Sequence, residues 1–169
     1  HDRDELIKQL PELKKKLLYY EDYSNQSIKD IFSDEKLSSS IVKYIDETRS
    51  IVLLSNGYLS YSKLSLPNEI QYSSVHAIKI KDLNNDGFED LILGGNQFLV
   101  KPQYGAFDAS KGWIIYGSKS SNKNFSKLKP LNISGEIRDF SIVNSNNKSD
   151  SLILVTGISN SKIITKNVK

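Results

Sequence analysis

Four oxygen-bearing side chains recur along one short stretch of the chain, with one or three residues between neighbours: Asp82, Asn84, Asp86 and Asp90. Gly87 follows the third of them, so the backbone can turn sharply there while the oxygens converge. Calcium is a hard cation that takes about six to eight oxygen ligands in proteins. We therefore predict a calcium site that these four side chains and the backbone carbonyl of Phe88 form together.

The segments on both sides of this loop have the composition of β-strands. Residues 76–81 precede the loop, and the apolar run 91–93 follows it. An EF-hand opens in the same way, but it needs a bidentate Glu at the twelfth loop position, where this chain has Leu93. A simple turn between two strands would need only Asp86 and Gly87, and it would leave Asp82, Asn84 and Asp90 unexplained. The sequence thus predicts a hairpin of strand, calcium loop and strand.

The hairpin resembles the Asp-x-Asn-x-Asp-Gly-x-x-Asp repeat of the FG-GAP and VCBS families, which are β-propellers like those of integrin α chains. Further similarity is to the C-terminal region of large VCBS-repeat proteins of Bacteroidetes that carry ASPIC/UnbV-type modules. It covers residues 3–11, 30–32, 101–105, 108–112 and 135–139 besides the loop.

This resemblance implies a location outside the cytoplasm, on the cell surface, at the outer membrane or secreted, often as a lipoprotein. It implies blades stabilised by Ca²⁺ and a binding or assembly role beside an outer-membrane complex such as a SusC/SusD-type importer. It implies no reaction. The remaining blades of the propeller are expected in the same polypeptide.

Composition sets wider limits. The chain has 169 residues, of which 38% are hydrophobic, and a net charge of +3 with acids and bases interspersed. These values suit one globular domain or part of a larger one, and they argue against a dedicated nucleic-acid surface. No apolar run reaches the roughly 18 residues of a transmembrane helix. The chain contains neither cysteine nor methionine, and the lack of methionine suggests a processed or excised piece of a longer protein.

Helical patterns are confined to the first part of the chain, residues 1–38. Apolar residues recur at helical spacing from Asp4 to Tyr23 (Leu6, Leu10, Leu13, Leu17 and Tyr20). Pro11 interrupts this pattern, so we expect a short turn and then a second helix that begins near Pro11. Ser27 and Ser33 are expected to cap two further short helices. The prediction is a helical segment that packs on the β-rich remainder.

Residues 39–169 have the patterns of short strands separated by Gly, Asn and Ser turns. The predicted strands are residues 40–45, 49–54, 58–64, 75–80, 90–93, 112–117, 125–131, 136–143, 150–156 and 162–165. Ser55-Asn56-Gly57 is the expected turn of one hairpin. The fold class predicted is mainly β, with antiparallel blades of a β-propeller. About two and a half blades are present, and the middle one combines residues 75–80, 90–93, 113–116 and 125–129.

Catalytic patterns are not found in the sequence. His1 and His76 have no metal-ligand spacing and no nucleophile motif beside them, so no triad can be assembled. The glycines form no phosphate-binding loop that opens a helix. Asp108 and Asp139 could in principle form the carboxylate pair of a glycosidase, but only their residue type suggests it. We predict that the chain is not an enzyme.

Aromatic residues after the calcium loop are the candidate binding surface for a partner or a glycan: Tyr104, Phe107 and Trp113. Exposed rings there could stack on sugars, whereas Trp113 and Tyr116 on a β run are more often buried between blades. The main hypothesis is a non-catalytic calcium-binding module, and the alternative is a glycan-binding or polysaccharide-acting extracellular domain. A third option is a dockerin-like calcium module, but dockerins have a second, paired calcium loop, and this sequence contains only one. Asp150-Ser151-Leu152 matches a short O-glycosylation motif.

Overall fold

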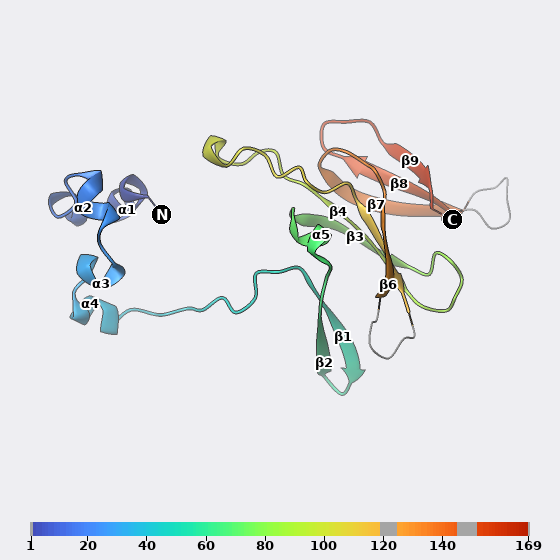
Figure 1. Ribbon diagram of the computed structural model, residues 1–169, viewed down its shortest axis with the longest axis horizontal. Coiled ribbons are helices and arrows are strands. Elements are labelled where there is room, and N and C mark those ends of the chain that lie inside the picture. The colour runs from blue at the N-terminus through green and yellow to red at the C-terminus, as the bar shows by residue number, and fades with distance from the viewer. Residues whose placement is uncertain (1, 119–124, 145–151, 169) are drawn as a thin grey trace. The chain divides into compact units, whose positions relative to one another are not determined.

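The computed structural model describes residues 2–118, 125–144 and 152–168, except the side chain of Ser126 (Figure 1). The chain divides into two compact units, His1–Glu47 and Thr48–Lys169. The first holds short helices and the second holds antiparallel sheets, so the protein is mainly β, as the sequence predicts. None of the described helices is long and apolar enough to cross a membrane.

The first unit contains α1 (Arg3–Gln9), the 3-10 turn η1 (Pro11–Lys15), α2 (Tyr20–Ser24), α3 (Ile28–Ile31) and α4 (Asp34–Ser38). Asp2 caps α1 by accepting from the Glu5 N–H, and Ser33 caps α4 by accepting from the Lys36 N–H. The helices enclose a small apolar cluster centred on Leu13, Leu17 and Ile31. Ser33 thus has the capping role predicted for it.

The second helix is shorter than predicted. A 3-10 turn does begin at Pro11, but the chain leaves helical geometry after Lys15 and resumes it only at Tyr20. The Arg3 guanidinium donates to the carbonyls of Leu17 (2.8 Å) and Leu18 (2.7 Å). These side-chain bonds satisfy carbonyls that would otherwise need a helical partner, so the interruption is stable.

The second unit contains three sheets. They comprise the hairpin β1 (Ile51–Gly57) and β2 (Ser60–Ser65), the sheet β3 (Val75–Lys81), β4 (Asp90–Gly95), β5 (Trp113–Gly117) and β6 (Phe125–Pro130), and the sheet β7 (Ile137–Asn144), β8 (Leu152–Ile158) and β9 (Ile164–Asn167). All neighbouring strands are antiparallel and consecutive in the chain. The four-stranded sheet β3-β4-β5-β6 is the arrangement predicted for the middle blade.

One strand prediction and one turn prediction near the start of this region were wrong. Residues 40–45 belong to no strand, and Ile41, Tyr44 and Ile45 are exposed there. A β-branched run favours an extended backbone but becomes a strand only when another edge pairs with it. The β1–β2 turn lies at Tyr58 and Leu59, both at positive φ, because a bulge between Ser55 and Gly57 shifts the register. The short helix α5 (Asn68–Gln71) was not predicted.

Each face of the four-stranded sheet is covered by a different element. On one face Ala77, Ile92 and Ile114 pack against residues of β7 and β8 such as Phe140 and Leu154. On the other face Leu91, Leu93 and Ile115 pack against Leu66, which precedes α5, and Ile70, which belongs to α5. Alternate residues of β4 therefore pack into two different apolar cores, which explains why all six residues of this strand are buried.

The β3–β4 and β7–β8 hairpins share one structural detail. In the first, the register shifts between Val75 and Ala77, and Ala77 then pairs with Gly94. In the second, it shifts between Ile137 and Asp139, and Asp139 pairs with Gly157. The same bulge thus lies near the start of the first strand in both sheets.

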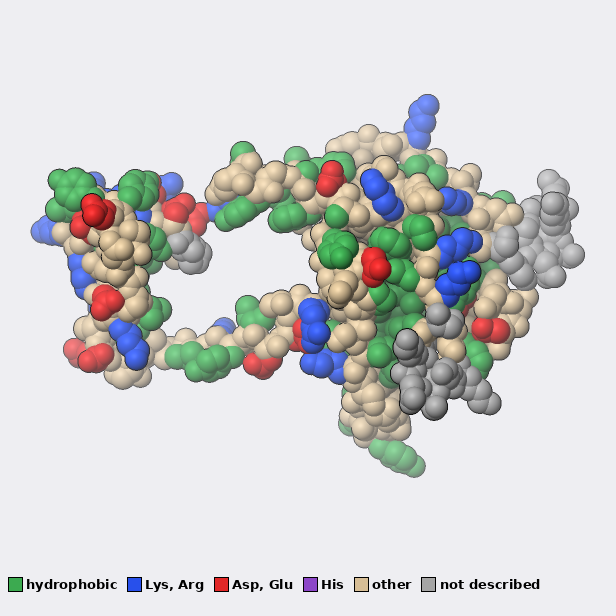
Figure 2. Space-filling view, viewed as in Figure 1, with side chains coloured by type: hydrophobic (Ala, Val, Ile, Leu, Met, Phe, Trp, Pro, Cys, Tyr) green, Lys and Arg blue, Asp and Glu red, His purple; other side chains and the backbone are tan. Residues whose placement is uncertain are grey.

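Within the described ranges the sheets do not close into a propeller. Acidic and basic side chains are interspersed with apolar ones on the visible face of the β-rich unit (Figure 2).

Candidate metal centre

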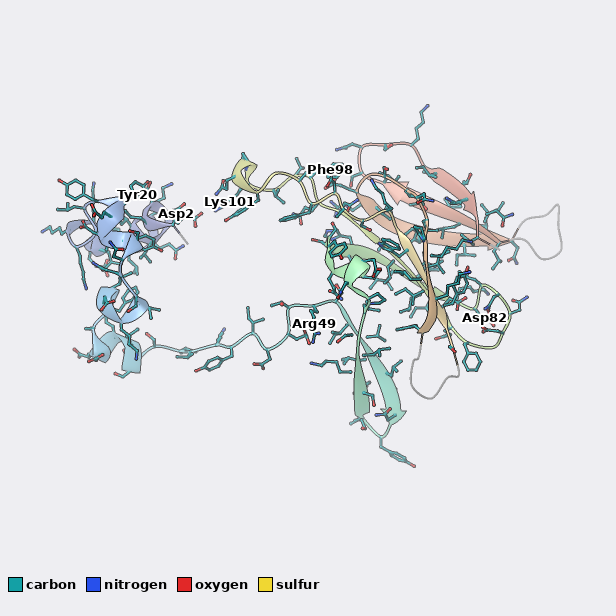
Figure 3. The ribbon with its side chains drawn as sticks, in the orientation of Figure 1. Asp2, Tyr20, Arg49, Asp82, Phe98 and Lys101 are labelled. Carbon is teal, nitrogen blue, oxygen red and sulfur yellow. The ribbon has the colours of Figure 1, made fainter. Side chains whose placement is uncertain are left out.

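The predicted calcium loop joins β3 to β4, and Asp82 lies at its start (Figure 3). β3 ends at Lys81, which pairs with Asp90, the first residue of β4. The two ends of the loop are therefore fixed by the sheet. Asn85 and Gly87 adopt positive φ of 60° and 87°, which an Asn and a Gly tolerate better than other residues.

Asp82 directs its carboxylate into the loop. One oxygen accepts from the Gly87 N–H at 2.9 Å and the other from the Asp86 N–H at 3.3 Å. Each carboxylate oxygen has more than one lone-pair site, so an oxygen that accepts an N–H bond can still ligate a cation. These bonds fix the orientation of the Asp82 side chain within the loop.

Asn84 and Asp86 contact each other on the exposed side of the loop. The Asn84 amide donates to the Asp86 carboxylate at 2.8 Å, and the Asn84 side-chain oxygen accepts from the Asp86 N–H at 3.2 Å. The second Asp86 oxygen accepts from the Phe88 N–H at 2.9 Å. Three of the four predicted side-chain ligands are therefore linked through the loop backbone.

Asp90 differs from the others because it is fully buried. One of its oxygens accepts from the Leu83 N–H at 2.9 Å, and the other accepts from the Gly117 N–H of β5 at 2.8 Å. The approach of β5 requires a glycine, since a Cβ at Gly117 would lie 2.4 Å from the Glu89 carbonyl oxygen. Asp90 thus joins both ends of the loop to the neighbouring strand.

Leu83 fixes the loop on its other side. Its side chain is 1% exposed and belongs to the core between the two larger sheets. The loop therefore has an apolar anchor at its second residue and a buried carboxylate at its end, while Asn84 and Asp86 remain in solvent.

The environment shifts the carboxyl pKa values at the two ends of the loop in opposite directions. Burial raises the pKa of Asp82, but the backbone N–H groups of residues 84–87 together outweigh it, so that the pKa is lowered. Burial raises the pKa of Asp90, and the charges of Asp86 and Asp82 raise it further. The hydrogen bonds from the N–H groups of Leu83 and Gly117 lower this pKa but do not outweigh the other effects. The ionised form of Asp90 is disfavoured in the folded protein, and a bound cation would favour it.

The donor set fits a hard cation in its chemistry, since it consists of carboxylate and carbonyl oxygens. Within the described ranges, no three His, Cys, Asp or Glu side chains lie in a metal-binding arrangement. The carboxylates of Asp82, Asp86 and Asp90 are therefore not brought together as a metal-binding group in this structure, and a cation site in the loop would also need the Asn84 oxygen and the Phe88 carbonyl.

The three predicted aromatic residues do not form one surface. Tyr104 and Phe107 are exposed on the long excursion between β4 and β5, where Gln97 and Phe107 form an isolated β-bridge and Pro102–Tyr104 forms the 3-10 turn η2. Trp113 lies at the start of β5 and packs on the core that contains Leu91 and Leu93. Phe98 and Leu99 add apolar groups to the excursion; Figure 3 labels Phe98 there.

Of the residues considered for catalysis, His76 is exposed on β3, Asp108 is exposed on the excursion and Asp139 is exposed on β7. His1 and the Asp150–Ser151 part of the glycosylation motif lie outside the described residues.

Two buried polar residues that hold the excursion in place were not predicted from the sequence. Asn96 bonds to the backbone of Ser110 and to the carbonyl of Gly135. Glu136 accepts from the Phe98 N–H at 2.6 Å and pairs with Arg138 at 3.0 Å. Asn96 directly follows Gly94-Gly95, and a polar residue at the end of an apolar run was the only available signal.

Comparison of the chain with family models, curated proteins and solved structures finds no significant match.

Proposed function

We propose that this chain is a non-catalytic, calcium-stabilised β module, and that the cation binds in the loop Asp82–Asp90. The observation that carries this proposal is the geometry of the loop. Asp82 and Asp86 are held by backbone N–H groups, and the buried Asp90 has a pKa raised by burial and by those two carboxylates. A cation would offset the repulsion, and its binding free energy would add to the stability of the fold.

The module is further proposed to be part of a β-propeller whose other blades belong to the same polypeptide. The four-stranded meander β3–β6 has the form of a blade, and the repeated bulge in β7–β8 supports a second one. Ile78 and Ile80 of β3 are exposed by 63% and 51%, and with Leu91 and Leu93 they line an apolar groove of about 400 Å³. A complete neighbouring blade would cover this face.

A location outside the cytoplasm and a role in an outer-membrane assembly, such as a SusC/SusD-type importer, are proposed from the motif resemblance. Purification of the native full-length protein in calcium, followed by elution with chelator, tests this part. Mass spectrometry should identify an envelope complex in the eluate. A protein that elutes alone would contradict the assembly role.

Titration calorimetry with calcium tests the metal site directly. We expect one site per chain in the wild type, and a loss of affinity of about tenfold or more in Asp82→Ala and Asp86→Ala. Asp108→Ala removes an exposed carboxylate outside the loop and should bind calcium as the wild type does. Equal affinity in all four proteins, or no binding heat in any of them, would contradict the proposal.

Binding of neutral glycans by the excursion is a second candidate function. Tyr104 and Phe107 are 63% and 43% exposed, as a stacking surface requires. Oligosaccharides should then raise the melting temperature of the wild type but not that of Tyr104→Ala. No shift across a broad panel of neutral glycans would exclude this function.

A further inference from the structure

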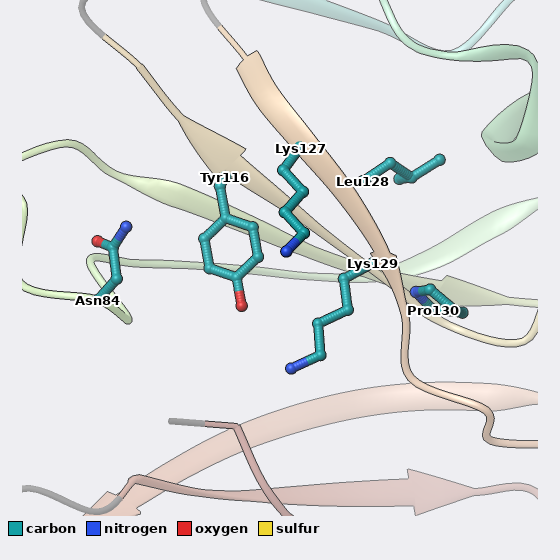
Figure 4. Close-up of a pocket in the computed structure, with 6 residues that line it drawn as sticks. All are labelled: Asn84, Tyr116, Lys127, Leu128, Lys129 and Pro130. Carbon is teal, nitrogen blue, oxygen red and sulfur yellow. The ribbon is translucent and has the colours of Figure 1, made fainter.

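A hollow of about 550 Å³ lies beside the calcium loop and is lined by residues of β5, β6 and the loop (Figure 4). Its lining consists of Asn84, Tyr116, Lys127, Leu128, Lys129 and Pro130. None of these residues except Asn84 belongs to the predicted metal site.

The sheet register explains why both lysines reach the hollow. Tyr116 pairs with Lys127, and Ile114 pairs with Lys129, so the two lysines lie on the same face of the sheet as Tyr116. Figure 4 shows the three side chains on one side of β6 and Leu128 pointing to the other side. Two cationic groups and a phenol thus converge from neighbouring strands.

The charges of these lysines are not neutralised within the described part of the chain. Both side chains are exposed, and no described carboxylate forms an ion pair with either ammonium group. Lys166 of β9 donates to the Leu131 carbonyl, next to Pro130, and adds a third cation near the end of β6. The hollow therefore favours an anion.

The charge of the calcium loop determines how tightly the hollow can bind an anion. Asn84 links it to a loop that carries the carboxylates of Asp82, Asp86 and Asp90. Without a cation these carboxylates repel an anion, and with calcium bound their charge is largely offset. An anionic ligand should therefore bind more tightly to the calcium form.

The ligand must also suit an aromatic ring and an apolar rim. Tyr116 is half-buried and packs against the main core, so its ring is held in place, and Pro130 contributes an apolar surface. A pyranose offers an apolar face for such contacts and hydroxyl groups for the phenol and the amide. A bare inorganic anion would use only the lysines.

We propose that this hollow binds an anionic sugar, such as a uronic acid unit of a polysaccharide, with Lys127 and Lys129 pairing with its carboxylate and Tyr116 contacting its ring. The proposal rests on the proposed calcium site for its metal dependence. The lysines and the tyrosine belong to β6 and β5, so their positions are set by the strand register and not by the loop.

Titration calorimetry of the whole chain with an oligogalacturonide tests the proposal, in calcium and in chelator. We expect binding in calcium, weaker binding in chelator, and a loss of at least about tenfold in affinity in the double variant Lys127→Ala/Lys129→Ala. Lys79→Ala removes an exposed lysine from β3, at the opposite edge of the same sheet, and should leave the affinity unchanged. A neutral galactose oligosaccharide should show no binding that depends on Lys127 and Lys129.

Other outcomes would overturn the proposal. No binding of the oligogalacturonide, or equal affinity in the double variant, would show that the hollow is not the site. Equal affinity for inorganic phosphate would show an oxyanion site without sugar recognition. Lysine-dependent binding that is the same in calcium and chelator would overturn the metal dependence alone. Calcium binding without sugar binding would contradict this inference and leave the proposed calcium site standing.

Discussion

At the residue scale, Asn96 connects three segments that are distant in the sequence. It is 1% exposed, its amide donates to the carbonyls of Ser110 (2.8 Å) and Gly135 (2.9 Å), and its oxygen accepts from the Ser110 N–H (2.9 Å). It also has a positive φ of 83°, which asparagine tolerates better than most residues. The two ends of the excursion and the segment before β7 therefore depend on one side chain.

Asn96→Ala should lower the free energy of unfolding by about 3 kcal/mol, because it leaves buried backbone groups without partners. Urea denaturation measures this. Asn160→Ala is the matched control, since Asn160 has a positive φ of 54° but is exposed. If both variants lose the same stability, the cost comes from backbone strain and the proposed role of the hydrogen bonds is wrong.

Glu136 gives a prediction about pH. The hydrogen bond from the Phe98 N–H is the main cause that lowers the pKa of Glu136. Arg138 and Ser159 lower this pKa further, whereas burial raises it. A carboxyl group whose pKa is lower in the folded than in the unfolded chain stabilises the fold at pH values above its unfolded pKa, which is near 4.5 for Glu136. This stabilisation is lost as the pH falls through the folded pKa.

The stability difference between wild type and Glu136→Gln should therefore be largest near neutral pH and should shrink as the pH falls below about 4.5. Urea denaturation over this pH range measures it. A difference that does not change with pH would mean that the charge of Glu136 has no part in holding the excursion.

At the scale of elements, the contact between β4 and β7 depends on the absence of a side chain at Gly94. A Cβ there would lie 2.7 Å from both Ile137 Cγ2 and Phe140 Cζ, which belong to the main core. Gly157 occupies the equivalent position of the β7–β8 hairpin, where a Cβ would meet its nearest neighbour at 3.8 Å.

Gly94→Ala should therefore destabilise the protein by about 1 to 3 kcal/mol through overpacking, whereas Gly157→Ala should change stability by only about 0.5 kcal/mol. Neither glycine has a positive φ, so backbone strain does not enter the comparison. Thermal or urea denaturation of both variants measures the effect. Similar losses in the two variants would contradict the close packing of the two sheets.

The same scale shows why some elements could be predicted from the sequence and others could not. In the β3–β6 sheet, β4 and β5 are apolar runs with Gly at their ends, and β3 and β6 alternate apolar and polar residues. Their order follows because each antiparallel strand pairs with the next. Residues 40–45 have an equally good pattern, but the partner edge that a strand needs is a tertiary property. The helix α5 is only four residues long and has no sequence period to detect.

The candidate site shows the same limit. The spacing of Asp82, Asn84 and Asp86 predicted three ligands on one loop, and the structure links these residues through that loop's backbone. The sequence did not reveal that Asp90 is buried and bonded to Gly117 of β5, since that contact joins residues 27 positions apart. Lys127 and Lys129 were missed because only the strand register brings them beside Tyr116.

At the scale of the whole molecule, the chain consists of two compact units that each have their own apolar core. The proposed calcium loop belongs to the second unit, and its two anchors, Leu83 and Asp90, both lie in contact with the sheet interior. A cation in the loop should therefore stabilise the entire β-rich unit. This connection between the loop and the core is the central claim of the proposed function.

Thermal denaturation in calcium and in chelator tests that claim most directly, with Asp86→Ala and Asp108→Ala measured beside the wild type. At calcium concentrations about 100 times the dissociation constant, binding should add about 2.7 kcal/mol, which raises the melting temperature by about 5 to 10 °C for a chain of this length. Asp86→Ala should lose most of this increase, and Asp108→Ala should keep it. A wild-type melting temperature that is the same in calcium and in chelator would contradict a structural calcium site.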